Sequence, residues 1–214
     1  PIMTRCTLCR SPEVQEYHQN ELYTYHRCDR CDLVFAEPGR RLDPGEEKQR
    51  YDQHENDPGD PAYREFLSQI FDPLNQKLEP GSSGLDYGAG PGPTLSVMFR
   101  EAGHKMEIYD PFYADRPHAL NKFYDFITCT ETAEHFYDPG KEFRTLWGLL
   151  KPGGILGLMT LLRPVEEPFS EWHYVKEDTH VAFYSKETFR WLAEKLNASL
   201  EILGERVILL RKAE

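Results

Sequence analysis

The chain has 214 residues, 39% of them hydrophobic, and a formal net charge of −11. Because one domain usually occupies about 100 to 200 residues, this length predicts one substantial domain with a small appendage. The acidic charge disfavours nucleic acid as a partner. The sequence shows neither an apolar stretch long enough to cross a bilayer nor an apolar leader segment, which favours a soluble, cytoplasmic protein without membrane contact.

Two Cys-x2-Cys pairs lie near the start of the chain, with 18 residues between them. Four thiolates at this spacing are typical of a structural zinc ribbon, in which they close a tetrahedral site. The alternative is a thioredoxin-like redox pair, but its alternating strands and helix are not evident here. We therefore predict a small zinc ribbon over residues 1–38, followed by a linker or active-site loop over 39–60, which is rich in Pro, Gly and charge. The zinc ligands would be Cys6, Cys9, Cys28 and Cys31.

The remaining residues, 61–214, alternate between short apolar strands and helices. Apolar residues recur at spacings of three and four over 61–78, which predicts a helix. After several strand and helix units, a helix capped by Ser185 precedes two strands, 198–204 and 206–212, which are predicted to pair antiparallel. This alternation predicts an α/β domain with a doubly wound, Rossmann-like sheet.

A glycine-rich turn follows the first strand of this domain, in the segment LDYGAGPG. Glycine lets a backbone turn sharply and come close to a ligand at little cost. Asp110 follows the next predicted strand, about 20 residues on, where a carboxylate can accept hydrogen bonds from both ribose hydroxyls. Asp86 stands two residues before the first glycine, and an acid there suits a cationic ligand better than a diphosphate. The alternative is a packing turn in a scaffold without a cofactor.

The segment LDYGAGPG resembles motif I of the class I S-adenosylmethionine (SAM)-dependent methyltransferases. The later segment EFRTLWGLLKPGGILGLMT is similar to the helix, turn and fifth strand of that family. The resemblance implies the class I methyltransferase fold and SAM as the methyl donor. It also implies the following cofactor contacts: Asp86, Gly88, Ala89, Gly90 and Gly92 at the methionine moiety, Asp110 at the ribose, and Pro111 and Phe112 at the adenine.

Only 14 residues separate Asp110 from Asp125, where the family usually fits a helix and a third strand. We therefore expect that strand to be lost or vestigial, and the adenine contacts to differ from those of the family.

An ExxEH segment, formed by Glu131, Glu134 and His135, follows the fourth predicted strand. It is similar to a segment of the methyltransferases of quinone biosynthesis and antibiotic sugars. In that family the backbone after this strand flanks the cofactor, which implies that Thr130 and Glu131 lie near the methionine end. In some ubiquinone O-methyltransferases and small-RNA 2′-O-methyltransferases, similar residues bind a divalent ion, and His180 could complete such a site for Mg²⁺ or Mn²⁺ here.

Two other interpretations of the same segment remain open. His135 or His180 could act as a general base beside Glu134, because imidazole titrates near neutrality. Alternatively, Glu134 and His135 could cap a helix and bond the backbone without any chemical role. The catalytic candidates are His135, His180 and Glu134, and the aromatic residues of 171–185 indicate a lid or acceptor wall.

The ribbon resembles a zinc-binding module of small-molecule methyltransferases, in which it helps cover the acceptor site or pair protomers. Tyr51 and His54 lie where relatives place a segment over the cofactor, so either could touch donor or acceptor. The sequence thus predicts a SAM-dependent methyltransferase, a monomer or homodimer, that methylates a small-molecule acceptor at oxygen. The alternatives are a non-catalytic module that binds SAM or S-adenosylhomocysteine (SAH), and an RNA or protein methyltransferase with a metal at ExxEH.

Overall fold

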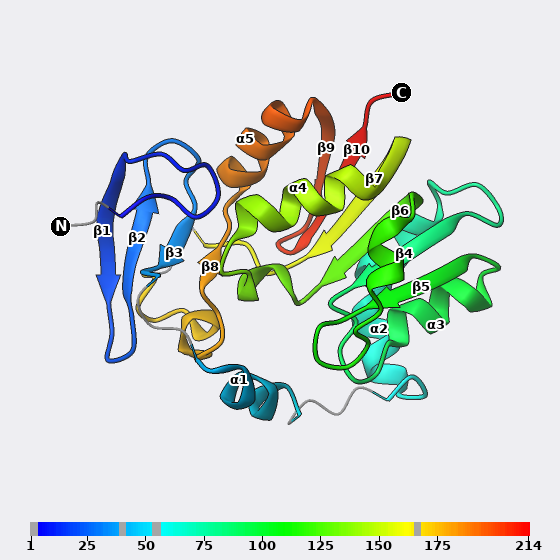
Figure 1. The fold of residues 1–214 in the computed structure, drawn as a ribbon, viewed down its shortest axis with the longest axis horizontal. Helices are drawn as coiled ribbons and strands as arrows, with labels where there is room; N and C mark the ends of the chain where they lie inside the picture. Colours follow the sequence, from blue (N-terminus) through cyan, green and yellow to red (C-terminus); the bar gives the residue numbers. More distant parts are fainter. Residues whose placement is uncertain (1–3, 39–41, 53–56, 165–167) are drawn as a thin grey trace.

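The computed structural model describes residues 4–38, 42–52, 57–164 and 168–214. A six-stranded sheet with the order β5-β4-β6-β7-β10-β9 forms the centre of the molecule (Figure 1). β4, β5, β6 and β7 are parallel, whereas β10 pairs antiparallel with both β7 and β9. The Rossmann-like sheet and its antiparallel final pair are therefore confirmed. The strands are β4 (Ser83–Tyr87), β5 (Lys105–Tyr109), β6 (Tyr124–Thr130), β7 (Leu150–Met159), β9 (Ala198–Leu203) and β10 (Val207–Lys212).

Helices cover both faces of this sheet, as a doubly wound fold requires. The two on one face, α2 (Pro61–Asn75) and α3 (Thr94–Glu101), bury the same apolar cluster. The opposite face carries α4 (Pro139–Leu149) and α5 (Lys186–Leu196), whose apolar residues join a second cluster. The predicted cap of α5 is present, because the Ser185 hydroxyl accepts the Thr188 amide at 3.2 Å. Among the described helices, none combines the length and apolar character that a bilayer crossing requires.

The sheet ends at β5, without the third strand that this fold usually carries. Residues 110–123 are all described, and they contain a single bridge between Asp110 and Ala114 and a 3-10 turn, η1 (Pro117–Asn121), but no strand. The expected loss of this strand is confirmed, because too few residues connect β5 to β6. At the end of β5 the chain instead forms the loop that follows Asp110, which is the segment predicted to contact the adenine.

The N-terminal unit, residues 4–38, is called the ribbon below. It forms a second antiparallel sheet, β1-β2-β3-β8, whose first three strands are β1 (Val14–Gln19), β2 (Thr24–Cys28) and β3 (Val34–Ala36). The fourth strand, β8 (Ala182–Phe183), comes from the C-terminal half of the chain, and Figure 1 shows it beside β3. Ribbon side chains such as Leu33 and Phe35 belong to the same apolar cluster as α4 and α5. The predicted domain boundary at residue 38 stays a prediction. The ribbon and the α/β domain share one apolar cluster, so they do not pack as separate units.

The segment predicted as a linker contains a helix, α1 (Pro44–Tyr51), which its loop-like composition did not indicate. Asp43 caps this helix by accepting the Gly45 and Glu46 amides, at 2.8 and 3.0 Å. The Glu46 carboxylate accepts the Asp43 amide in return, so the helix begins with a capping box. An acidic cap followed by Pro and, three residues on, Glu is the local signal for this helix.

Candidate functional site

The predicted site residues gather at one edge of the central sheet. The glycine loop follows β4, Asp110 follows β5, and the ExxEH segment follows β6. Because these strands are parallel, their carboxyl ends meet at the same edge, where open α/β sheets bind ligands. The topology therefore brings the donor and acceptor candidates together.

The glycine loop, residues 88–92, is anchored by its first residue between the ends of β5 and β6. Gly88 and Gly90 have positive φ angles of 75° and 63°, a region that L side chains enter only with strain. A Cβ at Gly88 would lie 2.3 Å from the Thr132 side chain. The Gly88 amide donates to the Tyr109 carbonyl at 2.8 Å, and the Thr132 hydroxyl donates to the Gly88 carbonyl at 3.2 Å. Glycine is thus required here by both conformation and space.

The Asp110 carboxylate holds the glycine loop against the loop that follows β5, which begins at Asp110 itself. Its carboxylate accepts the Gly90 amide at 2.9 Å on one oxygen and the amides of Phe112 and Tyr113 at 2.8 and 3.0 Å on the other. Since a carboxylate accepts about four hydrogen bonds, these three leave room for about one more donor. A two-hydroxyl ribose contact would have to share or displace one of the amides, and it stays a prediction. The neighbouring predicted contacts, Ala89, Gly92 and Pro111, lie in the same two loops.

Asp86 lies beneath the loop, with its side chain 2% exposed. One oxygen accepts the Thr128 hydroxyl at 2.9 Å, and the other accepts the Ser96 hydroxyl at 3.1 Å. Burial raises the pKa of this carboxyl to about 6, although the two hydroxyl bonds oppose the shift. Asp86 therefore braces β4 against β6 and α3, while its direct contact with the methionine moiety stays a prediction.

Glu131 begins the ExxEH segment in a left-handed conformation, with φ of 46°. Its amide donates to the Met159 carbonyl at 2.7 Å, and its carboxylate lies 3.6 Å from the Arg206 guanidinium. Burial and the nearby Glu134 charge raise the pKa of the Glu131 carboxyl to about 8, and Arg206 opposes this rise. The Glu131 carboxylate thus faces the positively charged side chain of Arg206, which lies in the turn between β9 and β10.

The structure brings Glu134, His135 and His180 together, although His135 and His180 are 45 residues apart in sequence. One ligating atom from each of the three lies within 4.8 Å of the other two. Glu134 is 1% exposed, and one of its oxygens accepts the Tyr174 hydroxyl. Its other oxygen is buried and has no hydrogen-bond donor among the described residues. A buried carboxylate oxygen without a donor is costly, so this position favours a cation or a donating group of a ligand.

Backbone carbonyls orient both imidazole rings. His135 Nδ1 lies 3.0 Å from the Thr179 carbonyl, and His180 Nδ1 lies 2.7 Å from the Tyr174 carbonyl. A carbonyl oxygen can only accept, so in the neutral rings Nδ1 carries the proton and Nε2 carries the lone pair. Each histidine is therefore set to act through Nε2, whether toward a proton or toward a metal ion.

Helix α1 brings Tyr51 to the boundary between the donor and acceptor candidates. The Tyr51 ring lies 5.2 Å from the His135 ring and 5.7 Å from the Phe112 ring, measured between centroids. The Tyr113 hydroxyl donates to the carboxylate of Asp52, directly after the helix, at 2.6 Å. Tyr51 thus occupies the position expected of a residue that touches donor or acceptor, and that contact stays a prediction.

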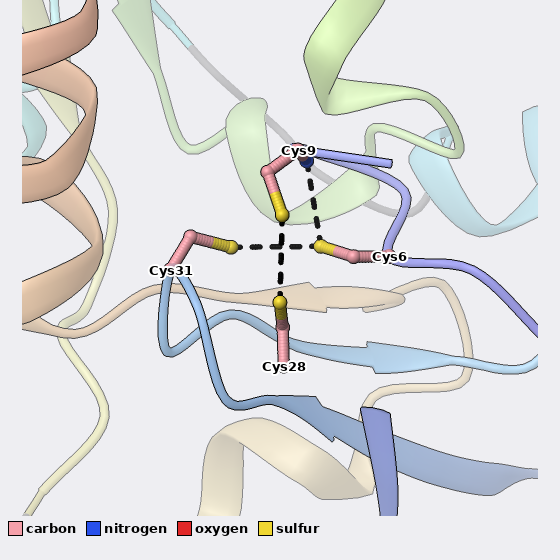
Figure 2. Close-up of side chains that lie close together, drawn as sticks. All are labelled: Cys6, Cys9, Cys28 and Cys31. Carbon is pink, nitrogen blue, oxygen red and sulfur yellow. Dashed lines mark hydrogen bonds between the residues drawn. The ribbon is translucent and has the colours of Figure 1, made fainter. Parts of the chain in front are cut away.

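The four paired cysteines converge on one point (Figure 2). Their Sγ atoms all lie within 4.8 Å of one another, with Cys6–Cys31 at 3.5 Å and Cys9–Cys28 at 3.4 Å. These distances are far longer than a disulfide bond of about 2.05 Å. Hydrogen bonds from neighbouring thiols lower the pKa of Cys28 far below its usual range, which favours a thiolate. The donor set and its closed geometry fit a tetrahedral zinc ion.

Two contributors to the site were not predicted from the sequence. They are Arg206, which faces Glu131, and Asp32, which joins the ribbon to the segment after β7 and to the cap of α5. Tyr174 lies in the aromatic segment predicted as a lid or acceptor wall, but its bond to Glu134 was not predicted. Each acts across a large sequence separation and carries no local motif. The predicted candidate His54 lies outside the described residues.

Comparison with known proteins shows which family the chain resembles. A family model described as "Methyltransferase domain" matches residues 32–201. Ubiquinone biosynthesis O-methyltransferases are similar over a shorter region, with 32% identity over 84 residues for Vibrio vulnificus and 33% over 81 residues for Sodalis glossinidius. The first alignment covers 39% of this chain and 36% of that enzyme, and the second covers 38% and 32%. The chain thus spans about a third of the length of these relatives.

Solved methyltransferases share the fold at low sequence identity. The 1,6-didemethyltoxoflavin-N1-methyltransferase of Burkholderia thailandensis, solved with SAH, superposes with a TM-score of 0.57 and 13% identity over 94% of this chain and 100% of that one. The magnesium protoporphyrin IX methyltransferase of Synechocystis, also with SAH, gives a TM-score of 0.57 and 13% identity over 80% and 95%. The class I fold is therefore confirmed.

Proposed function

The chain belongs to the methyltransferase-domain family, and from this premise we propose that it transfers the methyl group of SAM to an oxygen atom of a small-molecule acceptor. The observation that carries the proposal is the meeting of the glycine loop, Asp110 and the Glu134–His135–His180 group at the carboxyl edge of one class I sheet. The similarity to O-methyltransferases supports oxygen as the attacking atom.

On the donor side, the loop of residues 88–92 would hold the methionine and ribose portions of SAM. Asp110 keeps this loop in place and offers its remaining lone pair to the ribose. Phe112 and Pro111 follow directly and would flank the adenine. Thr130 and Glu131, at the end of β6, would lie beside the methionine end, where the Glu131 carboxylate suits an ammonium group.

On the acceptor side, the chain needs to align the nucleophile with the methyl group and exclude water. Bound SAM supplies an electrophilic methyl carbon, so much of the rate comes from positioning. Tyr51 and the buried aromatic residues Trp172 and Tyr174 would close the site from two sides. His135 or His180 would take the acceptor proton through Nε2, with Glu134 beside them.

The same three side chains fit a divalent cation. Two imidazole nitrogens and one carboxylate oxygen suit Mn²⁺ or a similar ion, and the undonated Glu134 oxygen favours a cation there. An ion held in this way would lower the pKa of an acceptor hydroxyl. Glu131 lies outside this group of three, so it would reach the ion only after a side-chain movement.

The four cysteines would hold a structural zinc ion in the ribbon. Four protein ligands leave no open position on zinc, so the ribbon metal would stabilise structure and take no part in methyl transfer. The net charge of −11 favours a small acceptor over nucleic acid.

The proposal is tested by calorimetric titration of the zinc-loaded protein with SAM and SAH. We expect micromolar binding of both, weakened about tenfold or more by Asp110→Ala, because a charged hydrogen bond contributes about 1.5 to 3 kcal/mol. The control is Asp115→Ala, an exposed acid in the same loop. Absence of binding by the unsubstituted protein would contradict the proposed function.

The choice between a general base and a cation is tested separately with Mn²⁺. Electron paramagnetic resonance should show one bound Mn²⁺ per chain if the cation interpretation holds, and His180→Gln should abolish it. His173→Gln, an exposed histidine of the same segment, is the control. If no Mn²⁺ binds, the cation interpretation is contradicted, and a general base or a purely structural role remains for these histidines.

A further inference from the structure

The first cysteine pair of the ribbon is seated on the start of α4, directly after the ExxEH segment. The Gly140 amide donates to the Thr7 carbonyl at 3.2 Å. A Cβ at Gly140 would lie 2.4 Å from the Leu8 carbonyl oxygen. Arg10, which follows the cysteine pair, forms an ion pair with Asp138, the N-cap of α4. Only glycine allows the two backbones to approach this closely.

The last ribbon strand, β3, forms a second contact, with the segment that carries the acceptor-site candidates. β3 pairs with β8, and the Ala36 amide donates to the Val181 carbonyl at 2.9 Å. The Val181 amide in turn donates to the Glu134 carbonyl at 2.8 Å. Val181 directly follows His180, so one residue is held by the ribbon on one side and by Glu134 on the other.

The second cysteine pair is fixed at a third place. Asp32, with φ of 59°, follows Cys31 and accepts the Ser185 hydroxyl at 2.5 Å and the Arg163 guanidinium at 2.6 Å. Arg163 follows the end of β7, and Ser185 caps α5. Through Asp32, the ribbon therefore contacts the chain both before His180, at Arg163, and after it, at Ser185.

We propose that the ribbon is a positioning element of the acceptor site, in which the zinc-bound cysteine pairs hold Glu134, His135 and His180 in register through Gly140 and Val181. The role rests on the proposed function, but it differs from covering the site or pairing protomers. The acceptor side depends on the zinc-bound ribbon, whereas the donor loop, anchored to β5 and β6, does not contact it through any of these bonds.

The test compares Gly140→Ala with Gly148→Ala. Both substitutions lie in α4, but a Cβ at Gly148 meets nothing within 4 Å, so it tests the effect of alanine in the helix alone. The readouts are zinc content, the SAM dissociation constant by calorimetry, and the ¹H–¹³C spectrum of the histidine rings. The His135 and His180 signals are assigned from the spectra of His135→Gln and His180→Gln.

We expect Gly140→Ala to shift or broaden both histidine signals while SAM affinity changes less than about twofold, one tenfold step being about 1.4 kcal/mol. Gly148→Ala should change neither readout. Removal of zinc from the unsubstituted protein by a chelator should change the same two signals. Unchanged histidine signals after both treatments would overturn the proposal, whereas failure of the unsubstituted protein to bind SAM would contradict the proposed function instead.

A milder variant covers the case in which Gly140→Ala does not fold. Arg10→Gln removes only the surface ion pair with Asp138, so the chain should fold and keep its zinc. We expect a smaller shift of the same two signals. If this variant and the chelated protein both give the unsubstituted spectrum, the ribbon does not position the site.

Discussion

The proposed donor and acceptor sides of the site are built in different ways. The donor side consists of two short loops, residues 88–92 and 110–113, which hold each other through backbone amides and the Asp110 carboxylate. The acceptor side takes its residues from the segment after β6, the segment before β8, and the surrounding α1 and ribbon. The first is a local motif, and the second is an assembly of distant segments.

This difference predicts which side of the site tolerates the loss of supporting contacts better. A loop held by the adjacent strand ends should keep its shape when the ribbon contacts are lost, whereas an assembled site should lose its geometry when one of its supports moves. The predicted consequences can be ranked by how much of the support each change removes.

The largest effect is expected from loss of a zinc ligand, as in Cys28→Ala. Structural zinc contributes about 10 kcal/mol or more to small zinc-binding domains, and Cys28 also lies within the apolar cluster shared with the central sheet. We expect the variant to lose zinc and to unfold at markedly lower denaturant concentration. Cys129→Ala is the control, because Cys129 is buried outside the cysteine cluster and should keep one zinc per chain. A zinc-free Cys28→Ala of unchanged stability would contradict this account.

A smaller loss is expected from Asp32→Asn. Asp32 and Arg163 form an ion pair whose side chains are only 15% and 10% exposed. Because removing one partner of a buried pair leaves the other charge uncompensated, we expect the free energy of unfolding to fall by about 3 kcal/mol. Denaturant titration measures it. Asp29→Asn changes an exposed ribbon carboxylate that accepts the Gln15 side-chain amide, and it should cost less than about 1 kcal/mol. Equal losses in the two variants would refute the buried role.

On the donor side, burial of the ionised Asp86 carboxylate lowers the free energy of unfolding, and this effect can be measured as a function of pH. The folded-state pKa is raised to about 6, against about 3.9 in an unfolded chain. The folded state therefore binds more protons between these values, and the contribution of Asp86 to stability falls as pH rises from about 4 to 6.

Asp86→Asn removes this titration and keeps groups that can bond the Thr128 and Ser96 hydroxyls. The difference in unfolding free energy, variant minus unsubstituted protein, should rise by roughly 2 kcal/mol between pH 4 and 7. Other titrating groups cancel in this difference. A difference that does not change with pH would show that the Asp86 pKa is not raised.

The contrast between a local motif and an assembly of distant segments also explains which features could be predicted from the sequence. The glycine loop, the Ser185 cap and the two cysteine pairs are short local patterns, and the structure contains each of them. The pairing of β3 with β8 could not be predicted, because a strand of two residues, Ala182–Phe183, has no periodicity to detect. The contacts of Tyr174 with Glu134 and of Arg206 with Glu131 likewise depend on tertiary placement. Local signals therefore predict the segments of the proposed donor side more completely than the contacts of the proposed acceptor side.

The smallest predicted effect separates two reasons for glycine in the donor loop. Gly88 and Gly81 both have φ of 75°, but a Cβ at Gly88 would meet the Thr132 side chain at 2.3 Å, whereas one at Gly81 would meet nothing within 4 Å. Gly81→Ala should therefore lower the unfolding free energy by about 1 kcal/mol through conformation alone. Gly88→Ala should lower it by about 2 kcal/mol, because Thr132 must also move.

Since Thr132 directly follows Glu131, that movement should also weaken SAM binding in Gly88→Ala and leave it unchanged in Gly81→Ala. Calorimetry of the two variants gives the comparison. Equal SAM affinities would mean that the loop tolerates a displaced Thr132. The donor side would then depend on Asp110 and the backbone of residues 88–92, and its independence from the segment after β6 would be greater than the structure implies.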